Sequence, residues 1–324
     1  MKQIVNFKRR NPLISLKSQN RGVWAVMLTP FTPDKQIDWE CLDQLIDWYI
    51  ESGVSGLFTV CQSGEMYTLT NEERLNLAYR VVKYSNERVP VVASGAFSNT
   101  LEKQAAFIKK MADTGVRAVV CLVNQIARQD ESDEYWKLNM EKLLDKTGNI
   151  YLGLYECPTP YHRTLSADIV GWAASTGRFI FMKQTSSHLN IIEKKIEAVR
   201  NTPMLLLNAD AATVLKSLRM GISGYSSIAA NFYPALWVWL CKHFKNQPEK
   251  ADQMQRLMSI AEGVVRHKYP TSAKLFLSMS GMKIGTTCRM CNYKLQDDEI
   301  SLLQALQEEV LLWYKGLGLG ETIC

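Results

Sequence analysis

Eight short apolar runs, many of them rich in β-branched residues, recur along this chain at similar intervals. Each run is followed by a longer segment of helical periodicity. Their last residues are separated by 31, 33, 30, 32, 28, 25 and 19 positions, about the length of one strand plus one crossover helix. Eight such units that close on themselves form a (β/α)8 barrel. The expected strands are Val23–Thr29, Gly56–Val60, Pro90–Ala93, Ala118–Val123, Tyr151–Tyr155, Phe179–Lys183, Met204–Asn208 and Gly224–Ser227.

Helix-capping signals support this division of the chain. Thr70 and Glu73 have the spacing of a capping box at the start of the second expected helix. Gly53 and Gly115 stand where the first and third helices should stop. The alternative fold is an open, doubly wound sheet, but the segment 29–33 after the first strand contains no glycine and so lacks the dinucleotide fingerprint of that fold.

We expect three segments along the chain. Residues 1–21 form a basic, flexible N-terminal arm, residues 22–234 form the barrel, and residues 235–324 form a helical bundle that packs on the barrel or makes a subunit contact. The helical patterns of the last segment lie near Ala235–Phe244, Ala251–His267, Thr271–Ser278 and Asp298–Tyr314.

The net charge of +6 comes from the arm, because residues 1–21 hold six basic residues and the first acidic residue is Asp34. The rest of the chain carries 32 basic and 32 acidic side chains. A nucleic-acid groove needs a clustered basic surface on the folded part, so we expect no nucleic-acid partner. An arm without acidic residues also fits an organelle transit peptide, which remains an alternative to a flexible tail.

The chain has no run of roughly 18 apolar residues, so we expect no membrane-spanning segment. The arm lacks the apolar core of a secretory signal, which predicts a cytoplasmic location where the eight cysteines stay reduced. Only Cys288 and Cys291 have the spacing of a metal or redox pair, and further zinc ligands are missing nearby. The four histidines are far apart in sequence, so we expect neither a metal nor a cofactor.

The end of the sixth expected strand carries the strongest chemical signal. Active sites of barrel enzymes lie at the C-terminal ends of the strands, and the apolar run 179–182 ends in Lys183. An ammonium group in such a place loses hydration, which lowers its pKa and favours the nucleophilic amine that Schiff-base chemistry requires. The alternative is a lysine whose amine reaches solvent at the strand end.

Two other strand ends offer supporting groups. Tyr155 closes the fifth run, where a phenol beside an amine can move a proton to or from a substrate oxygen, although a half-buried core tyrosine is the alternative. After the second run, the turn Cys61–Glu65 can direct backbone N–H groups and the Ser63 hydroxyl toward an anion. Short polar turns are common, so this turn alone does not indicate a function.

Taken in order, these segments resemble the dihydrodipicolinate synthase and N-acetylneuraminate lyase family, Schiff-base lyases built on a (β/α)8 barrel with a C-terminal helical extension. The resemblance extends from about Gly22 to Pro234. The matching segments are Ala25–Phe31, Ser63–Glu65, Leu69–Arg74, Val89–Ala93, Tyr155 with Pro158, Lys183 with Thr185, Asp210, and Gly221–Gly224 with Asn231 and Pro234.

The resemblance implies that Lys183 forms an imine with a 2-oxo acid, usually pyruvate, and that Tyr155 is the acid and base. The protonated imine withdraws electrons, so the neighbouring carbon can lose a proton or break a bond to give an enamine, which can attack an aldehyde. This describes a cofactor-free lyase of the class I aldolase type, expected as a homo-oligomer, either a dimer or a homotetramer. The expected substrate-binding residues are Gln62, Ser63, Gly64, Thr185, Arg163 and Asp210.

Three departures from the family pattern bear on the second substrate. Gln62 replaces a hydroxyl that relays protons to the tyrosine, and Val123–Ile126 replaces a segment that contributes a tyrosine across the subunit interface. Pro160 stands where the synthases have an arginine for the second substrate's carboxylate, which leaves Arg163 as the substitute or as a solvated surface residue.

These departures leave three functional hypotheses open. The first is a lyase or aldolase for a 2-oxo acid and an unidentified aldehyde. The second is dihydrodipicolinate synthase itself, and the third is a descendant that binds a 2-oxo acid without turnover. Trp136, Trp237 and Trp239 are candidate anchors of an oligomer interface, although core burial explains them equally well.

Overall fold

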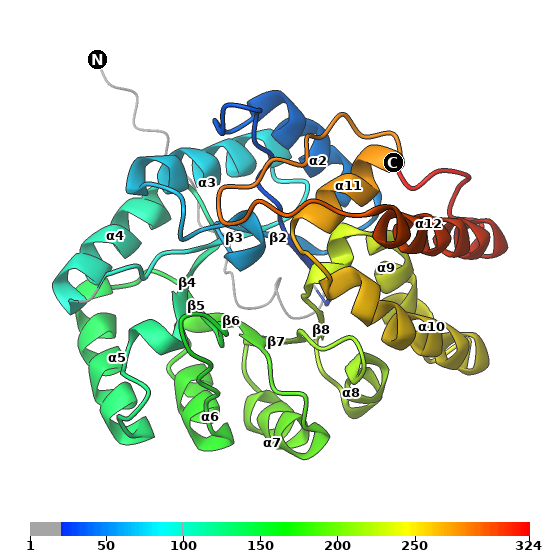
Figure 1. The fold of residues 1–324 in the computed structure, drawn as a ribbon. Helices are drawn as coiled ribbons and strands as arrows, with labels where there is room; N and C mark the ends of the chain where they lie inside the picture. The colour runs from blue at the N-terminus through cyan, green and yellow to red at the C-terminus, as the bar shows by residue number, and fades with distance from the viewer. Residues whose placement is uncertain (1–20, 99) are drawn as a thin grey trace.

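The structure, a computed structural model, describes residues 21–98 and 100–324. Eight parallel strands close into a barrel in chain order, and the first strand pairs with the eighth (Figure 1). The predicted (β/α)8 barrel is therefore confirmed, and every strand end lies within three residues of its predicted position. The strands are β1 (Gly22–Val26), β2 (Gly56–Thr59), β3 (Val91–Ser94), β4 (Ala118–Leu122), β5 (Leu152–Tyr155), β6 (Phe179–Gln184), β7 (Leu205–Asn208) and β8 (Gly224–Tyr225).

Helices surround the barrel, as the crossover spacing requires (Figure 1). The helices between strands are α2 (Trp39–Glu51), α3 (Asn71–Ser85), α4 (Leu101–Asp113), α5 (Asp133–Thr147), α6 (Ala167–Ser175), α7 (Leu189–Val199) and α8 (Val214–Met220). After the barrel come α9 (Pro234–His243), α10 (Pro248–Arg266), α11 (Thr271–Met279) and α12 (Asp297–Leu317). α9 packs against β1, while α10 and α11 both contact α12.

The predicted helix ends are also present. The Thr70 hydroxyl accepts a hydrogen bond from the Glu73 backbone N–H at 3.1 Å, and the Glu73 carboxylate accepts one from the Thr70 N–H at 2.8 Å, which completes the capping box of α3. Gly53 and Gly115 follow α2 and α4 with φ angles of +83° and +93°, a conformation that residues with a Cβ rarely adopt.

Aromatic side chains fill the barrel below the C-terminal ends of its strands. Phe181 makes edge contacts with Trp24 and Phe58, with ring centroids 5.1 and 5.6 Å apart. Phe58 in turn makes an edge contact with Tyr155, with centroids 5.7 Å apart. The barrel interior below the rim is therefore apolar and closely packed.

The three tryptophans proposed as interface anchors belong to the core. Trp136 and Trp237 are fully buried and Trp239 is nearly so. The Trp136 indole donates to the Val123 carbonyl at 2.9 Å, and Trp237 stacks on Tyr225 with centroids 4.0 Å apart. Because buried rings cannot contact a partner chain, the interface interpretation of these residues is wrong and the core alternative holds.

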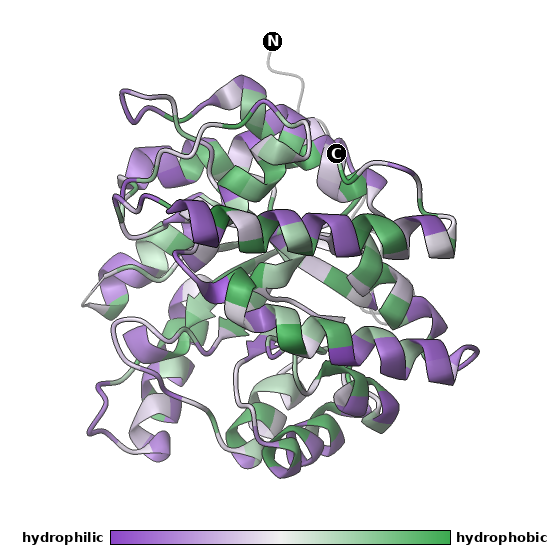
Figure 2. Ribbon diagram, turned by 45° about the vertical axis from the view of Figure 1, so that its right-hand side comes forward, coloured by the Kyte–Doolittle hydropathy of each residue, from purple (hydrophilic) through white to green (hydrophobic). Residues whose placement is uncertain are grey.

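One hydrophobic core includes residues of both the barrel and the C-terminal helices. The long outer helices carry both hydrophobic and hydrophilic residues, as expected for helices with one face toward this core (Figure 2). Among the described residues, no helix is long and apolar enough to cross a membrane. The predicted basic arm lies outside the described residues except for Arg21, whose guanidinium donates to the carbonyls of Gly221 and Ile222.

Candidate active site

Lys183 lies near the C-terminal end of β6 and is 5% exposed. Its backbone pairs with that of Tyr155 on β5, and its Nζ lies 4.7 Å from the centroid of the Tyr155 ring. Burial lowers the pKa of Lys183 from 10.5 to about 8, and the charge of Arg266 acts in the same direction. The amine thus does not reach solvent, and it loses its proton far more readily than an ordinary lysine.

Tyr155 presents its hydroxyl to the turn after β2. Its Oη donates a hydrogen bond to Gln62 Oε1 at 3.3 Å. Burial raises the pKa of Tyr155, so the phenol stays protonated. Because the donated hydrogen bond directs the phenol proton toward Gln62, the lone pairs of Oη remain available to a reacting group beside Lys183.

The turn after β2 is a short 3-10 helix, Gln62–Gly64. Val60 and Glu65, which flank it, have φ angles of +48° and +58°, and a β-branched residue in this region is strained. A side chain at Gly64 would place its Cβ 2.9 Å from Thr29 Oγ1 and 3.0 Å from the Met27 carbonyl oxygen. The surrounding structure therefore specifies this turn closely.

The polar groups of this turn are partly engaged within the protein. The Gly64 N–H donates to the Cys61 carbonyl at 3.1 Å. The Ser63 side chain is 4% exposed and forms a hydrogen bond with Tyr269 that opposes the burial-driven rise in the pKa of that tyrosine. Binding of a substrate carboxylate by the Ser63 hydroxyl and the backbone N–H groups of this turn stays a prediction for this chain.

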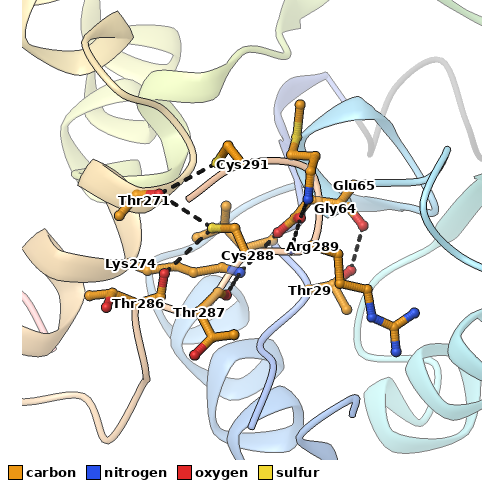
Figure 3. A network of polar contacts seen from close by, with 12 residues as sticks. Thr29, Gly64, Glu65, Thr271, Lys274, Thr286, Thr287, Cys288, Arg289 and Cys291 are labelled. Atoms are coloured by element: carbon orange, nitrogen blue, oxygen red, sulfur yellow. Dashed lines mark hydrogen bonds and ion pairs between the residues drawn. The ribbon is translucent and has the colours of Figure 1, made fainter. Parts of the chain in front are cut away.

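A buried ion pair between Glu65 and Lys274 connects the turn after β2 with helix α11 (Figure 3). Lys274 of α11 donates to Glu65 Oε1 at 3.0 Å, and neither side chain is exposed. Glu65 Oε2 accepts hydrogen bonds from the backbone N–H groups of Arg289 and Met290 at 2.6 and 2.8 Å. One carboxylate therefore joins the active-site turn, α11 and the segment between α11 and α12.

The same segment is fixed by Arg289. Its guanidinium binds both carboxylate oxygens of Glu73, at 2.7 and 2.9 Å, and lies 4.6 Å from the centroid of the Phe31 ring. Cys288 and Cys291 of this segment both lie close to Thr271 Oγ1, at 3.4 and 3.6 Å (Figure 3). In the part of the chain that the structure describes, no group of three His, Cys, Asp or Glu side chains could hold a metal ion.

A second buried ion pair organises the strand ends beside Lys183. Lys195 of α7 donates to Glu156 Oε1 at 2.5 Å, with both side chains fully buried. The Glu156 carboxylate also accepts hydrogen bonds from the N–H groups of Leu165 and Thr185, at 2.8 and 2.9 Å. The Thr185 hydroxyl donates to the Glu156 carbonyl and lies 2.6 Å from His162 Nε2. The predicted residue Thr185 is thus part of this network.

Two further predicted residues already have partners within the protein. The Arg163 guanidinium donates to the carbonyls of Arg128 and Glu131 and to the Asp133 carboxylate, at 2.8–2.9 Å, and its side chain is 10% exposed. Asp210 accepts hydrogen bonds from the Ala212 N–H and the Thr213 hydroxyl. Substrate binding by Arg163 and Asp210 stays a prediction.

Sequence reasoning missed two residues of the site. The Cys157 thiol donates to Gln62 Oε1 at 3.5 Å, and Tyr67 Oη lies 3.8 Å from Cys157 Sγ. Cys157 follows Tyr155 by two positions. Side chains two positions apart in an extended segment lie on the same side, so the position of Tyr155 could have predicted that Cys157 also faces the site. Tyr67 gave no such signal, because its contact joins two loops 90 residues apart.

Comparison with known proteins identifies the family of this chain. The model of the Dihydrodipicolinate synthetase family matches residues 19–309. The 4-hydroxy-tetrahydrodipicolinate synthase of Oceanobacillus iheyensis is 26% identical over 288 residues, which cover 88% of this chain and 95% of that protein. The Bacillus subtilis enzyme of the same name is also 26% identical, over 89% of this chain and 98% of its own length.

Solved structures share the fold. A monomeric dihydrodipicolinate synthase variant superposes with a TM-score of 0.81 at 20% identity, covering 90% of this chain and 97% of that one. A prophage protein of Escherichia coli K12 from the dihydrodipicolinic acid synthase family, solved in complex with pyruvate, gives a TM-score of 0.80 at 21% identity, covering 90% of this chain and 98% of that one.

The ion pair that holds the turn predicts a large effect on stability. Replacing Lys274 by methionine leaves the Glu65 carboxylate buried without its partner, so we expect the free energy of unfolding to fall by about 3–5 kcal/mol. Urea unfolding followed by circular dichroism measures this change. In the control Arg219→Ala, which breaks the exposed pair with Asp252, the free energy of unfolding should not change measurably. Equal effects of the two substitutions would contradict the structural role of the buried pair.

The lowered pKa of Lys183 predicts its reactivity as a function of pH. With a pKa of about 8, the neutral amine fraction rises about tenfold per pH unit below pH 8 and levels off above it. Competitive acetylation by acetic anhydride, read for the Lys183 peptide by mass spectrometry, should therefore give a midpoint near pH 8. A midpoint close to the value of an ordinary lysine, about 10.4, would show that burial does not lower this pKa.

Proposed function

Because the chain belongs to the dihydrodipicolinate synthetase family, we propose that it is a lyase of the class I aldolase type in which Lys183 forms a Schiff base with pyruvate or a related 2-oxo acid. The observation that carries the proposal is the buried amine of Lys183, with a lowered pKa, directly beside the Tyr155 ring at the C-terminal end of the barrel. The named relatives are synthases, which supports an enzymatic role.

The reaction would proceed in balanced steps. The neutral amine of Lys183 attacks the carbonyl carbon of the 2-oxo acid, and the carbonyl oxygen leaves as water after two protonations. The protonated imine then withdraws electrons from the adjacent carbon, which loses a proton to Tyr155 Oη while the phenol releases its own proton, and an enamine forms. The enamine carbon attacks an aldehyde to form a carbon–carbon bond while the aldehyde oxygen takes up a proton, and water then hydrolyses the imine to free the Lys183 amine. The reverse sequence cleaves the carbon–carbon bond.

The turn after β2 is suited to the substrate carboxylate. The Ser63 hydroxyl lies in a turn fixed by the Glu65–Lys274 pair, so it is already oriented before substrate binds. The Gln62 side chain connects this turn with the Tyr155 hydroxyl. The pyruvate complex of the E. coli prophage protein supports a small 2-oxo acid as the substrate class for this chain as well.

Dihydrodipicolinate synthase activity is the second candidate, because the curated relatives carry the name 4-hydroxy-tetrahydrodipicolinate synthase. Two observations favour a different aldehyde. Arg163, the substitute for a carboxylate-binding arginine, is held by the 128–133 loop, and Gln62 stands where a hydroxyl would relay protons. Turnover of pyruvate with aspartate semialdehyde at typical enzyme rates would favour the synthase.

The predicted homo-oligomer and the cytoplasmic location are part of this proposal. A descendant that binds a 2-oxo acid without turnover is the third hypothesis. It predicts imine formation without an aldehyde or condensation product across a broad substrate panel.

Borohydride trapping tests the Schiff base directly. Protein incubated with pyruvate and reduced with borohydride should carry one pyruvyl adduct, which peptide mapping places on Lys183. The adduct should be absent in Lys183→Arg and unchanged in Lys216→Arg, a control at an exposed position on α8. The lyase proposal fails if neither pyruvate nor larger 2-oxo acids form an adduct, or if the adduct persists in Lys183→Arg.

A further inference from the structure

Gln62 is the acceptor for two donors next to the proposed reaction centre. The Tyr155 hydroxyl and the Cys157 thiol both donate to its Oε1, at 3.3 and 3.5 Å. Its amide nitrogen donates to Thr159 Oγ1 at 2.8 Å, which fixes the orientation of the carboxamide. Gln62 therefore holds the phenol and the thiol side by side.

A carboxamide cannot pass on the proton that it accepts. Its oxygen only accepts hydrogen bonds and its NH2 group only donates them, whereas a relay group must do both at one atom. Each time Tyr155 takes a proton from a reacting carbon, its own proton must leave toward solvent. Gln62 offers no route for that proton, so another neighbour of Tyr155 must supply one.

Cys157 is that neighbour. Its sulfur both donates and accepts hydrogen bonds, although weakly, and its side chain is fully buried. Burial raises the pKa of Cys157, so it remains a thiol with a transferable proton. Burial and, after it, the neighbouring Cys157 also raise the pKa of the Tyr155 phenol.

Tyr67 connects the thiol with the surface. Its Oη lies 3.8 Å from Cys157 Sγ and donates to the Thr159 carbonyl at 2.8 Å. The Tyr67 ring packs edge-on against Phe97, with centroids 6.4 Å apart, which limits its movement. Because the residue is 41% exposed, the outer end of this chain of groups meets water.

We propose that Cys157 and Tyr67 form the path by which protons move between Tyr155 and solvent, with Gln62 holding the inner two groups in place. The inference rests on the proposed Schiff-base function, since it concerns the protons that this reaction releases. Cys157 and Tyr67 touch no reacting atom themselves and act through Tyr155.

The proton transfer balances without an oxidant or a reductant. Tyr155 Oη accepts a proton from the carbon next to the imine while its own O–H turns from Gln62 Oε1 toward Cys157 Sγ and gives its proton to the sulfur. The S–H of Cys157 turns from Gln62 Oε1 to Tyr67 Oη, 3.8 Å away, and gives up its proton there, while the Tyr67 proton leaves the Thr159 carbonyl for water. Every group regains one proton, one proton reaches solvent, and the reverse transfer returns a proton to the enamine.

Exchange of the pyruvate methyl protons with D2O, followed by ¹H NMR, tests this path without an aldehyde. We expect Cys157→Ala and Tyr67→Phe to slow the exchange by about 100-fold, the low end of general acid–base contributions. Cys157→Ser, whose hydroxyl both donates and accepts, should recover most of the rate lost in Cys157→Ala. Tyr79→Phe removes a hydroxyl from a residue that is 52% exposed and serves as the control.

Borohydride trapping at equilibrium accompanies each exchange measurement and separates two failures. If the wild type gives no pyruvate adduct, the proposed function fails, and the relay, the proton path through Cys157 and Tyr67, fails with it. If all variants form the adduct but exchange at the wild-type rate, only the relay is wrong. The relay is equally overturned if the wild type forms the adduct without exchange, or if Cys157→Ser loses as much rate as Cys157→Ala, since packing alone would then explain the effect.

Discussion

Exclusion of water from the Lys183 amine is the constraint on which the rest of this structure depends. A lysine that is 5% exposed keeps a pKa near 8 only because the closed barrel places apolar side chains beneath it. Trp24, Phe58 and Phe181 fill that interior and support the Tyr155 ring. The same burial that costs hydration energy for the ammonium form gives the amine its nucleophilic character, so core packing and reactivity have one physical origin.

Two buried ion pairs position the polar groups around this amine. Glu65 with Lys274 fixes the turn after β2, and Glu156 with Lys195 fixes the ends of β5 and β6. Each carboxylate also accepts two backbone N–H groups, so its negative charge is compensated by several donors rather than by one lysine. These contacts hold the loop residues as rigidly as residues of the core. A site whose groups must be oriented before the substrate binds requires such rigidity.

The barrel and the pairing of Lys183 with Tyr155 were predictable from the sequence because both follow from local periodicity. Strand spacing determines which residues end neighbouring strands, and those ends lie at one rim. The contacts of Glu65 with Lys274, 209 residues away, and of Tyr67 with Cys157 were not predictable, because loop-to-loop packing has no periodic signal. The partners of Arg163 were missed for the same reason, since a guanidinium in a loop gives no indication of which carbonyls will surround it.

The crystal structure of the protein after reduction with pyruvate and borohydride tests the central claim most directly. The account predicts continuous electron density from Lys183 Nζ to the second carbon of the pyruvyl group, with the carboxylate at the Ser63 hydroxyl and the methyl carbon facing Tyr155 Oη. An unmodified Lys183, or an adduct whose carboxylate points away from the turn after β2, would contradict it. The first result would remove the amine from the chemistry, and the second would remove the turn.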